Sequence, residues 1–143
     1  MDTFGPLVSA QELEDRLDTP VLCDVRWYTD GRIGREEFES GHIPGAVFVD
    51  LDQRLASPDN GAESGRHPFP PAEDFAQWLG SIGVGPATPV VAYDNAGGFS
   101  AGRLVWMLRI LGHPAALLNG GLAAWSGPLS SEETRRPAVS CPI

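Results

Sequence analysis

The sequence contains no lysine, only two cysteines and no long apolar run. The chain has ten arginines and 19 acidic residues, which gives a net charge of −9 with histidine neutral. A chain this acidic is a poor match for nucleic acid or an anionic membrane surface, so we expect neither as a partner. Cys23 and Cys141 are too few for a disulfide framework or a cysteine-based metal site, and we expect no metal and no cofactor.

Membrane and export signals are also missing. No stretch approaches the roughly 18 apolar residues of a transmembrane helix. The first residues lack the basic start and apolar core of a signal peptide, and we therefore expect a cytoplasmic protein. The 143 residues, 42% of them hydrophobic and 20% charged, are typical of one ordinary globular domain.

Strand patterns alternate with helix patterns along the chain. We expect strands at 20–25, 46–50 and 89–94, and a fourth strand followed by a turn within 115–121, where the glycines of Asn119–Gly121 suit a turn with positive φ. Helical patterns occupy 9–17, 35–40, 71–83 and 100–112, with a final helical turn at 122–125. Such alternation predicts parallel βαβ units, and hence an α/β fold with an open, mainly parallel sheet and helices on both faces. We expect a single domain over 1–127, a long surface loop over 52–71, and a linker or frayed tail over 128–143.

In open α/β folds, ligands bind beyond the carboxyl ends of the strands. Three segments are predicted to lie there: 24–27, 49–52 and 93–98. The last belongs to a strand–turn–helix in which Asp94 follows an apolar run and a glycine-bearing turn leads into a helix. Such a turn aims several backbone N–H groups at one point, a place where many enzymes hold an anion or a nucleophile.

Asp94 has two readings from its position. As a structural group, its carboxylate would accept the N–H bonds of the turn and interact favourably with the helix dipole. As a nucleophile, it would resemble the aspartate of phosphate-transferring enzymes, which need a magnesium site and usually a second acid. The turn that follows offers no such acid, so we favour the structural role.

Other polar candidates also have structural explanations. We expect the ring nitrogens of His42 to hold loop backbone, and Asp24 to form an ion pair with Arg26, although Arg26 could instead reach an anionic ligand. The helix at 100–112 is apolar on nearly every side, which predicts that it is buried. Arg103 and Arg109 on that helix must then meet carboxylates or carbonyls, and with Arg26 they are candidate interface or pocket residues.

Five segments together resemble the rhodanese family. They are "CDVRWY", "EEFESGHIPGAVFVDLD", "GRHPFP", "YDNAGGFSAGRLVWMLRILGH" and "LNGGLAAW", in this order between about Leu7 and Trp125. More narrowly, they are similar to the N-terminal half of tandem-domain thiosulfate or 3-mercaptopyruvate sulfurtransferases.

The resemblance implies a mechanism and a departure from it. In the family, a cysteine after the central strand accepts sulfur, holds it as a persulfide and passes it to cyanide or another thiophile. Here Asp94 stands at that cysteine position, as in the non-catalytic half of the tandem enzymes. The resemblance therefore implies no catalytic residue in this chain. It also implies an active-loop equivalent formed by Asp94, Asn95, Ala96, Gly97, Gly98, Phe99 and Ser100.

Three functional hypotheses remain open at this point. The first is a non-catalytic domain that shapes the active-site mouth of a second rhodanese-like domain, in the same polypeptide or a separate chain. The second is a stand-alone enzyme or sulfur-handling protein that uses Cys23, Asp94 or Cys141. The third is a binding module whose loop holds a small anion. The nearly uncharged stretch from Phe75 to Ser131 favours an interface, and hence a partner domain or self-association.

Overall fold

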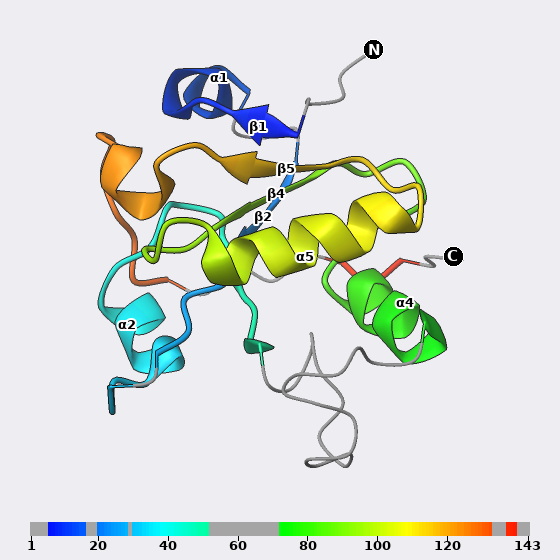
Figure 1. Ribbon diagram of the computed structural model, residues 1–143, viewed down its shortest axis with the longest axis horizontal. Helices are drawn as coiled ribbons and strands as arrows, with labels where there is room; N and C mark the ends of the chain where they lie inside the picture. Colours follow the sequence, from blue (N-terminus) through cyan, green and yellow to red (C-terminus); the bar gives the residue numbers. More distant parts are fainter. Residues whose placement is uncertain (1–5, 17–19, 29, 52–71, 133–136, 140–143) are drawn as a thin grey trace.

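The computed structural model describes residues 6–16, 20–28, 30–51, 72–132 and 137–139 (Figure 1). The expected loop at 52–71, Cys141 and much of the expected tail lie outside these residues. Within them, no helix is long and apolar enough to cross a membrane.

Five parallel strands form one open sheet in the order β1-β5-β4-β2-β3. The strands are β1 (Leu7–Val8), β2 (Val21–Asp24), β3 (Val47–Phe48), β4 (Val90–Tyr93) and β5 (Ala115–Leu118). Within the described ranges, four α-helices accompany them, α1 (Ala10–Asp15), α2 (Gly34–Ser40), α4 (Ala72–Ser81) and α5 (Phe99–Ile110), with a 3₁₀ helix, η2 (Gly121–Ala124). The predicted α/β class and parallel sheet are confirmed.

Two apolar clusters fill the two faces of the sheet. One joins alternate residues of β2 and β4 to α4 and α5, and it includes Cys23, which is fully buried. The other joins the intervening residues of the same strands to α1 and α2. Helices therefore cover both faces, as the sequence predicted, and Figure 1 shows α5 lying across the front of the sheet.

Local sequence explains several of the helix ends. Ser9 and Glu12 form a capping box: the Ser9 hydroxyl accepts from the Glu12 N–H, and the Glu12 carboxylate accepts from the Ser9 N–H. Gly41 follows the last residue of α2, where the sequence predicted the helix to stop.

Two expectations need correction. The sequence pattern predicts no strand at Leu7 and Val8, but they pair with Leu117 and Leu118 as β1, a two-residue strand that is defined only by its pairing with β5. The helix α5 is also not buried on every side. Trp106 is 53% exposed and Ile110 is 64% exposed, while Leu104 and Leu108 are fully buried. One face of α5 packs on the sheet, and its opposite face is open.

A buried polar network joins the ends of β2 and β4. The Tyr93 hydroxyl donates to Asp24 Oδ2 at 2.7 Å and accepts from the Ile43 N–H at 3.1 Å. Arg26 Nη2 lies 2.8 Å from Asp24 Oδ2, which is the expected ion pair, and donates to the Gly41 carbonyl at 2.7 Å. Burial, and then the neighbouring Asp24 charge, raise the pKa of Tyr93 above its ordinary value.

His42 holds loop backbone, as predicted. Its Nδ1 lies 2.7 Å from the Phe38 carbonyl oxygen and its Nε2 lies 2.7 Å from the Glu132 carbonyl oxygen. The imidazole also stacks on the Phe38 ring, with 3.7 Å between ring centroids. Backbone bonds between His42 and Ser130 add to this contact. The loop before β3 and the chain after η2 are therefore held together at His42.

We expect Tyr93→Phe to lower the free energy of unfolding by about 1–3 kcal/mol, because the Ile43 N–H loses its acceptor and Asp24 loses a donor in a buried place. The raised pKa of Tyr93 adds a pH dependence. The neutral Tyr93 hydroxyl makes its full contribution to the free energy of unfolding at pH values below the ordinary tyrosine pKa. This contribution is lost as the pH rises above that value, because the unfolded chain then loses the tyrosine proton more readily than the folded one. Urea unfolding at neutral and alkaline pH measures both effects.

The matched control is Ser40→Ala, since the Ser40 hydroxyl makes a single hydrogen bond, to the Glu37 carbonyl, and makes it on the exposed surface. A Tyr93→Phe protein as stable as this control would contradict the prediction.

Candidate functional site

The Asp94 carboxylate accepts four backbone hydrogen bonds. Oδ1 accepts from the N–H groups of Ala96 and Gly98, each at 2.9 Å. Oδ2 accepts from the N–H groups of Ser100 at 2.9 Å and Ala101 at 2.8 Å. Asp94 is only 1% exposed. Its carboxylate therefore satisfies the N–H groups at the start of α5, the structural role that the sequence favoured.

Glycines allow the loop to close around this carboxylate. Gly97 and Gly98 have φ values of 74° and 92°, in the left-handed region that other residues rarely adopt. At Gly98 a Cβ atom would also meet Leu117 Cδ2 at 2.9 Å. The glycines of the turn are therefore required by backbone geometry.

The turn that follows β5 contacts the backbone of Asp94. The Leu122 N–H donates to the Asp94 carbonyl oxygen at 2.9 Å. A Cβ atom on Gly121 would collide with that same oxygen, so the glycine lets the turn after β5 approach the loop closely. The sequence identified the Asn119–Gly121 turn by its glycines alone, and its contact with Asp94 was not foreseen.

The residues that follow Asp94 in its loop differ in their contacts and in their exposure to solvent. The Asn95 side chain donates to the Tyr28 hydroxyl at 2.8 Å, which ties the loop to the segment after β2. Ser100 is buried, whereas Phe99 is 75% exposed. The loop thus presents an aromatic ring to the surface beside a carboxylate that is enclosed.

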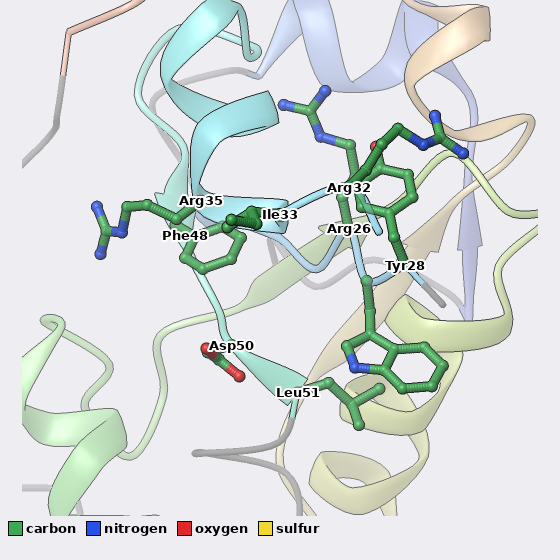
Figure 2. Close-up of a pocket in the computed structure, with 10 residues that line it drawn as sticks. Arg26, Tyr28, Arg32, Ile33, Arg35, Phe48, Asp50 and Leu51 are labelled. Atoms are coloured by element: carbon green, nitrogen blue, oxygen red, sulfur yellow. The ribbon is translucent and has the colours of Figure 1, made fainter. Parts of the chain in front are cut away.

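The three predicted edge segments do come together. The strands β4, β2 and β3 are neighbours in the sheet, so the segments that follow them share one edge. A pocket of about 250 Å³ lies at this edge (Figure 2). It is lined by Arg26, Trp27, Tyr28, Arg32, Ile33, Gly34, Arg35, Phe48, Asp50 and Leu51.

Two arginine–aromatic pairs flank this pocket. The Arg32 guanidinium lies 4.0 Å from the centroid of the Tyr28 ring, and that of Arg35 lies 5.1 Å from the centroid of the Phe48 ring. Figure 2 shows the two guanidinium groups on opposite sides of the view. The Asp30 carboxylate, 2.8 Å from Arg32 Nη2, compensates one of these charges. The lining as a whole holds three arginines and one aspartate, and ion pairs with Asp24 and Asp30 compensate Arg26 and Arg32.

The predicted arginines occupy three different places. Arg26 lines the pocket while its guanidinium binds Asp24. Arg109 Nε donates to the Ala115 carbonyl at 2.9 Å, which is a carbonyl partner of the kind expected for this helix. Arg103 lies on α5, half-buried, and this burial lowers its pKa. The structure does not gather them into one site.

Sequence reasoning missed the pocket residues Tyr28, Arg32, Arg35 and Phe48. The signal that could have found them is position, since all four lie in or near segments that follow β2 and β3 at the predicted edge. Among the described residues there is no group of three or more histidine, cysteine or acidic side chains that could hold a metal ion.

Comparison with known proteins adds a consistent picture. The profile of the rhodanese-like domain matches residues 9–128. The chain is 44% identical over 145 residues to human 3-mercaptopyruvate sulfurtransferase, covering 90% of the chain and 47% of that protein. It is 37% identical over 130 residues to thiosulfate sulfurtransferase of Cricetulus griseus, covering 82% and 41%. The structure of 3-mercaptopyruvate sulfurtransferase from Leishmania major superposes with a TM-score of 0.85 at 30% identity, covering 95% of the chain and 40% of that structure.

The chain thus spans about half the length of the curated relatives that it matches.

We expect Asp94→Asn to lower the free energy of unfolding by about 2 kcal/mol or more. The asparagine keeps one acceptor oxygen, but its NH₂ group would face two N–H donors that now bind a carboxylate oxygen. Asp94→Ala is expected to be destabilising as well, because all four donors lose their partner. Urea unfolding at neutral pH measures both variants.

Asp30→Asn is the matched control, since this exposed carboxylate also accepts a backbone N–H, from Arg32, but in solvent. We expect its unfolding midpoint to stay close to that of the wild type. An Asp94→Asn protein of unchanged or increased stability would instead point to a strained acid kept for function.

Proposed function

The chain belongs to the rhodanese-like domain family, and from this membership we propose that it is the non-catalytic half of a two-domain sulfurtransferase. The observation that carries the proposal is the enclosed Asp94 carboxylate, bound by four N–H groups at the head of α5. In the family pattern, a cysteine at this place carries sulfur as a persulfide anion.

The physical requirement of that chemistry explains why Asp94 prevents it. A thiolate or persulfide at a helix N-terminus is stabilised by the backbone N–H groups and the helix dipole. Here a fixed negative charge already uses those donors, and a carboxylate does not form a persulfide. The loop keeps an anion-holding shape, but the anion is part of the protein.

The role left to this half is to shape the cleft of its partner. The pocket and the Asp94 loop share one edge of the sheet and are joined by the bond from Asn95 to Tyr28. We propose that this edge faces the persulfide-bearing loop of a second rhodanese-like domain. The reaction of the pair would be transfer of sulfur from 3-mercaptopyruvate or thiosulfate, the substrates that name the relatives, to cyanide or another thiophile.

The alternative of a stand-alone sulfur-handling protein gains no support from the described residues. Cys23 is fully buried in the middle of β2, where neither a sulfur donor nor an acceptor reaches its thiol. A small-anion-binding role for the loop meets the same difficulty as persulfide chemistry, because the Asp94 carboxylate occupies the place of the anion.

The isolated 143-residue chain is expected to give no thiocyanate above background when 3-mercaptopyruvate or thiosulfate is mixed with cyanide. The reason is that no cysteine stands at the head of α5. A colorimetric thiocyanate assay measures this. Turnover that disappears in Cys23→Ser or Cys141→Ser would contradict the proposal and favour the stand-alone enzyme.

Asp94→Cys, made together with Cys141→Ser, is expected to place a thiol at the head of α5. We expect the pKa of this thiol to lie below that of an ordinary exposed cysteine. The same backbone N–H groups would then stabilise a thiolate. The pH dependence of alkylation by iodoacetamide, followed by mass spectrometry, reports this pKa.

The matched control is Ser126→Cys in the same background, since Ser126 lies on the exposed surface. Equal pH profiles for the two introduced thiols would mean that the loop does not have the electrostatic character of a persulfide site.

A further inference from the structure

The His42 ring contacts two carbonyl oxygens at once. Its Nδ1 lies 2.7 Å from the carbonyl oxygen of Phe38, and its Nε2 lies 2.7 Å from that of Glu132, 90 positions away in the sequence. The backbone of His42 also donates to the Ser130 carbonyl at 2.9 Å and accepts from the Ser130 N–H at 2.7 Å. We call these four residues the His42 clasp, because they join α2 and the loop before β3 to the chain after η2.

The two carbonyl contacts require two protons on the ring. A carbonyl oxygen only accepts hydrogen bonds, and a neutral imidazole carries a single N–H. With a neutral ring, a nitrogen lone pair would face one of the two carbonyl oxygens at 2.7 Å. His42 is completely buried, so bulk water cannot supply the missing donor. Only the imidazolium form satisfies both oxygens.

The immediate surroundings of the ring suit a cation. Phe38 lies in the last turn of α2, where the helix dipole places its negative end and where histidine commonly binds the final carbonyls. The Phe38 ring also lies parallel to the imidazole, with 3.7 Å between the ring centroids. The face of an aromatic ring attracts a positive charge. The closed clasp therefore favours the protonated ring.

The other titratable groups on the elements around His42 change charge outside the histidine range. Arg26, which donates to the carbonyl of Gly41, is paired with Asp24. Burial, and then the Asp24 charge, raise the pKa of Tyr93, so this hydroxyl stays neutral. The remaining charged residues of these elements are at least partly exposed: Arg35, Glu36, Glu37 and Glu39 on α2, and Glu132. Carboxylic acids titrate below histidine, and tyrosine and arginine titrate above it. His42 is therefore the group whose charge changes near neutral pH.

We propose that His42 is a proton-dependent switch: the protonated ring holds the clasp closed, and loss of one ring proton to solvent opens it on the Glu132 side. The Phe38 carbonyl is fixed within α2, whereas Ser131 and Glu132 are exposed. The exposed segment is thus the partner that can move away from the ring. This device is independent of the function proposed above, because no residue of the Asp94 loop takes part in it.

The test follows the complete ¹⁵N-labelled chain by NMR from about pH 5 to about pH 8, the range in which histidine changes its charge. Hydrogen exchange gives the protection factor of the Ser130 N–H, which donates to the His42 carbonyl. A difference of one bound proton changes an equilibrium up to tenfold per pH unit, so we expect this protection factor to fall at least about tenfold over the range. The ring nitrogen shifts of His42 should show two protons wherever the Ser130 N–H is protected.

Two controls separate opening of the clasp from unfolding of the domain. In the same spectra, the Val25 N–H, which donates to the Tyr93 carbonyl at 2.8 Å, should keep its protection factor. His113→Gln is the matched variant, because His113 is also buried but its ring contacts one carbonyl, that of Thr88, which a neutral ring can satisfy. We expect this variant to keep the pH dependence of the Ser130 N–H.

His42→Gln should abolish that pH dependence, because the glutamine amide does not titrate. A pH dependence that survives in this variant would belong to another group and would overturn the proposal. The wild-type chain alone also decides the question, whether or not the variant folds. The proposal is wrong if the Ser130 protection factor stays constant, if it falls only together with that of Val25, or if the ring carries one proton while the Ser130 N–H is protected.

Discussion

The arrangement of the site depends on one buried carboxylate. Asp94 accepts four N–H bonds from the loop and the first turn of α5, while its own carbonyl accepts from Leu122. Asp94 thus hydrogen-bonds to three segments: the loop that follows β4, the first turn of α5 and the turn that follows β5. A buried carboxylate is stable only when it is hydrogen-bonded this fully, and here backbone N–H groups donate all four bonds. The same bonds engage four of the N–H groups that an anion at the head of the helix would use.

A second set of buried polar groups keeps the edge of the sheet in shape. Asp24, Arg26 and Tyr93 join β2, β4 and the loop before β3, and each is almost completely buried. The His42 ring adds a link between α2 and the chain after η2, because its two nitrogens contact the carbonyl oxygens of Phe38 and Glu132. The pocket and the Asp94 loop are consequently built on an edge whose buried polar groups are hydrogen-bonded, which the proposed role of shaping a partner's cleft requires.

Much of the fold and part of the site could be predicted from local patterns. The strands around Cys23 and Ala92 are short apolar runs, and Ser9, Gly41 and the glycines after Asp94 mark ends and turns by their backbone chemistry. The capping role of Asp94 followed from a carboxylate at a helix start. The strand at Leu7 could not be predicted from local pattern, because it exists only through its pairing with β5. The exposure of Trp106 could not be predicted either, because it depends on which side of α5 packs against the sheet.

The sequence by itself determined the alternation of strands and helices, the net negative charge and the presence of an aspartate between a strand and a glycine-bearing turn, since these are properties of residue type and spacing. Only the tertiary structure decided how that aspartate is used. Four N–H groups from positions 96–101 converge on it because two glycines take left-handed conformations and Gly121 lets a distant turn come close. The pocket between the ends of β2 and β3 likewise arises from packing, because its residues are adjacent only after the sheet has formed. The packing of α5 on the sheet decides which side of that helix stays open.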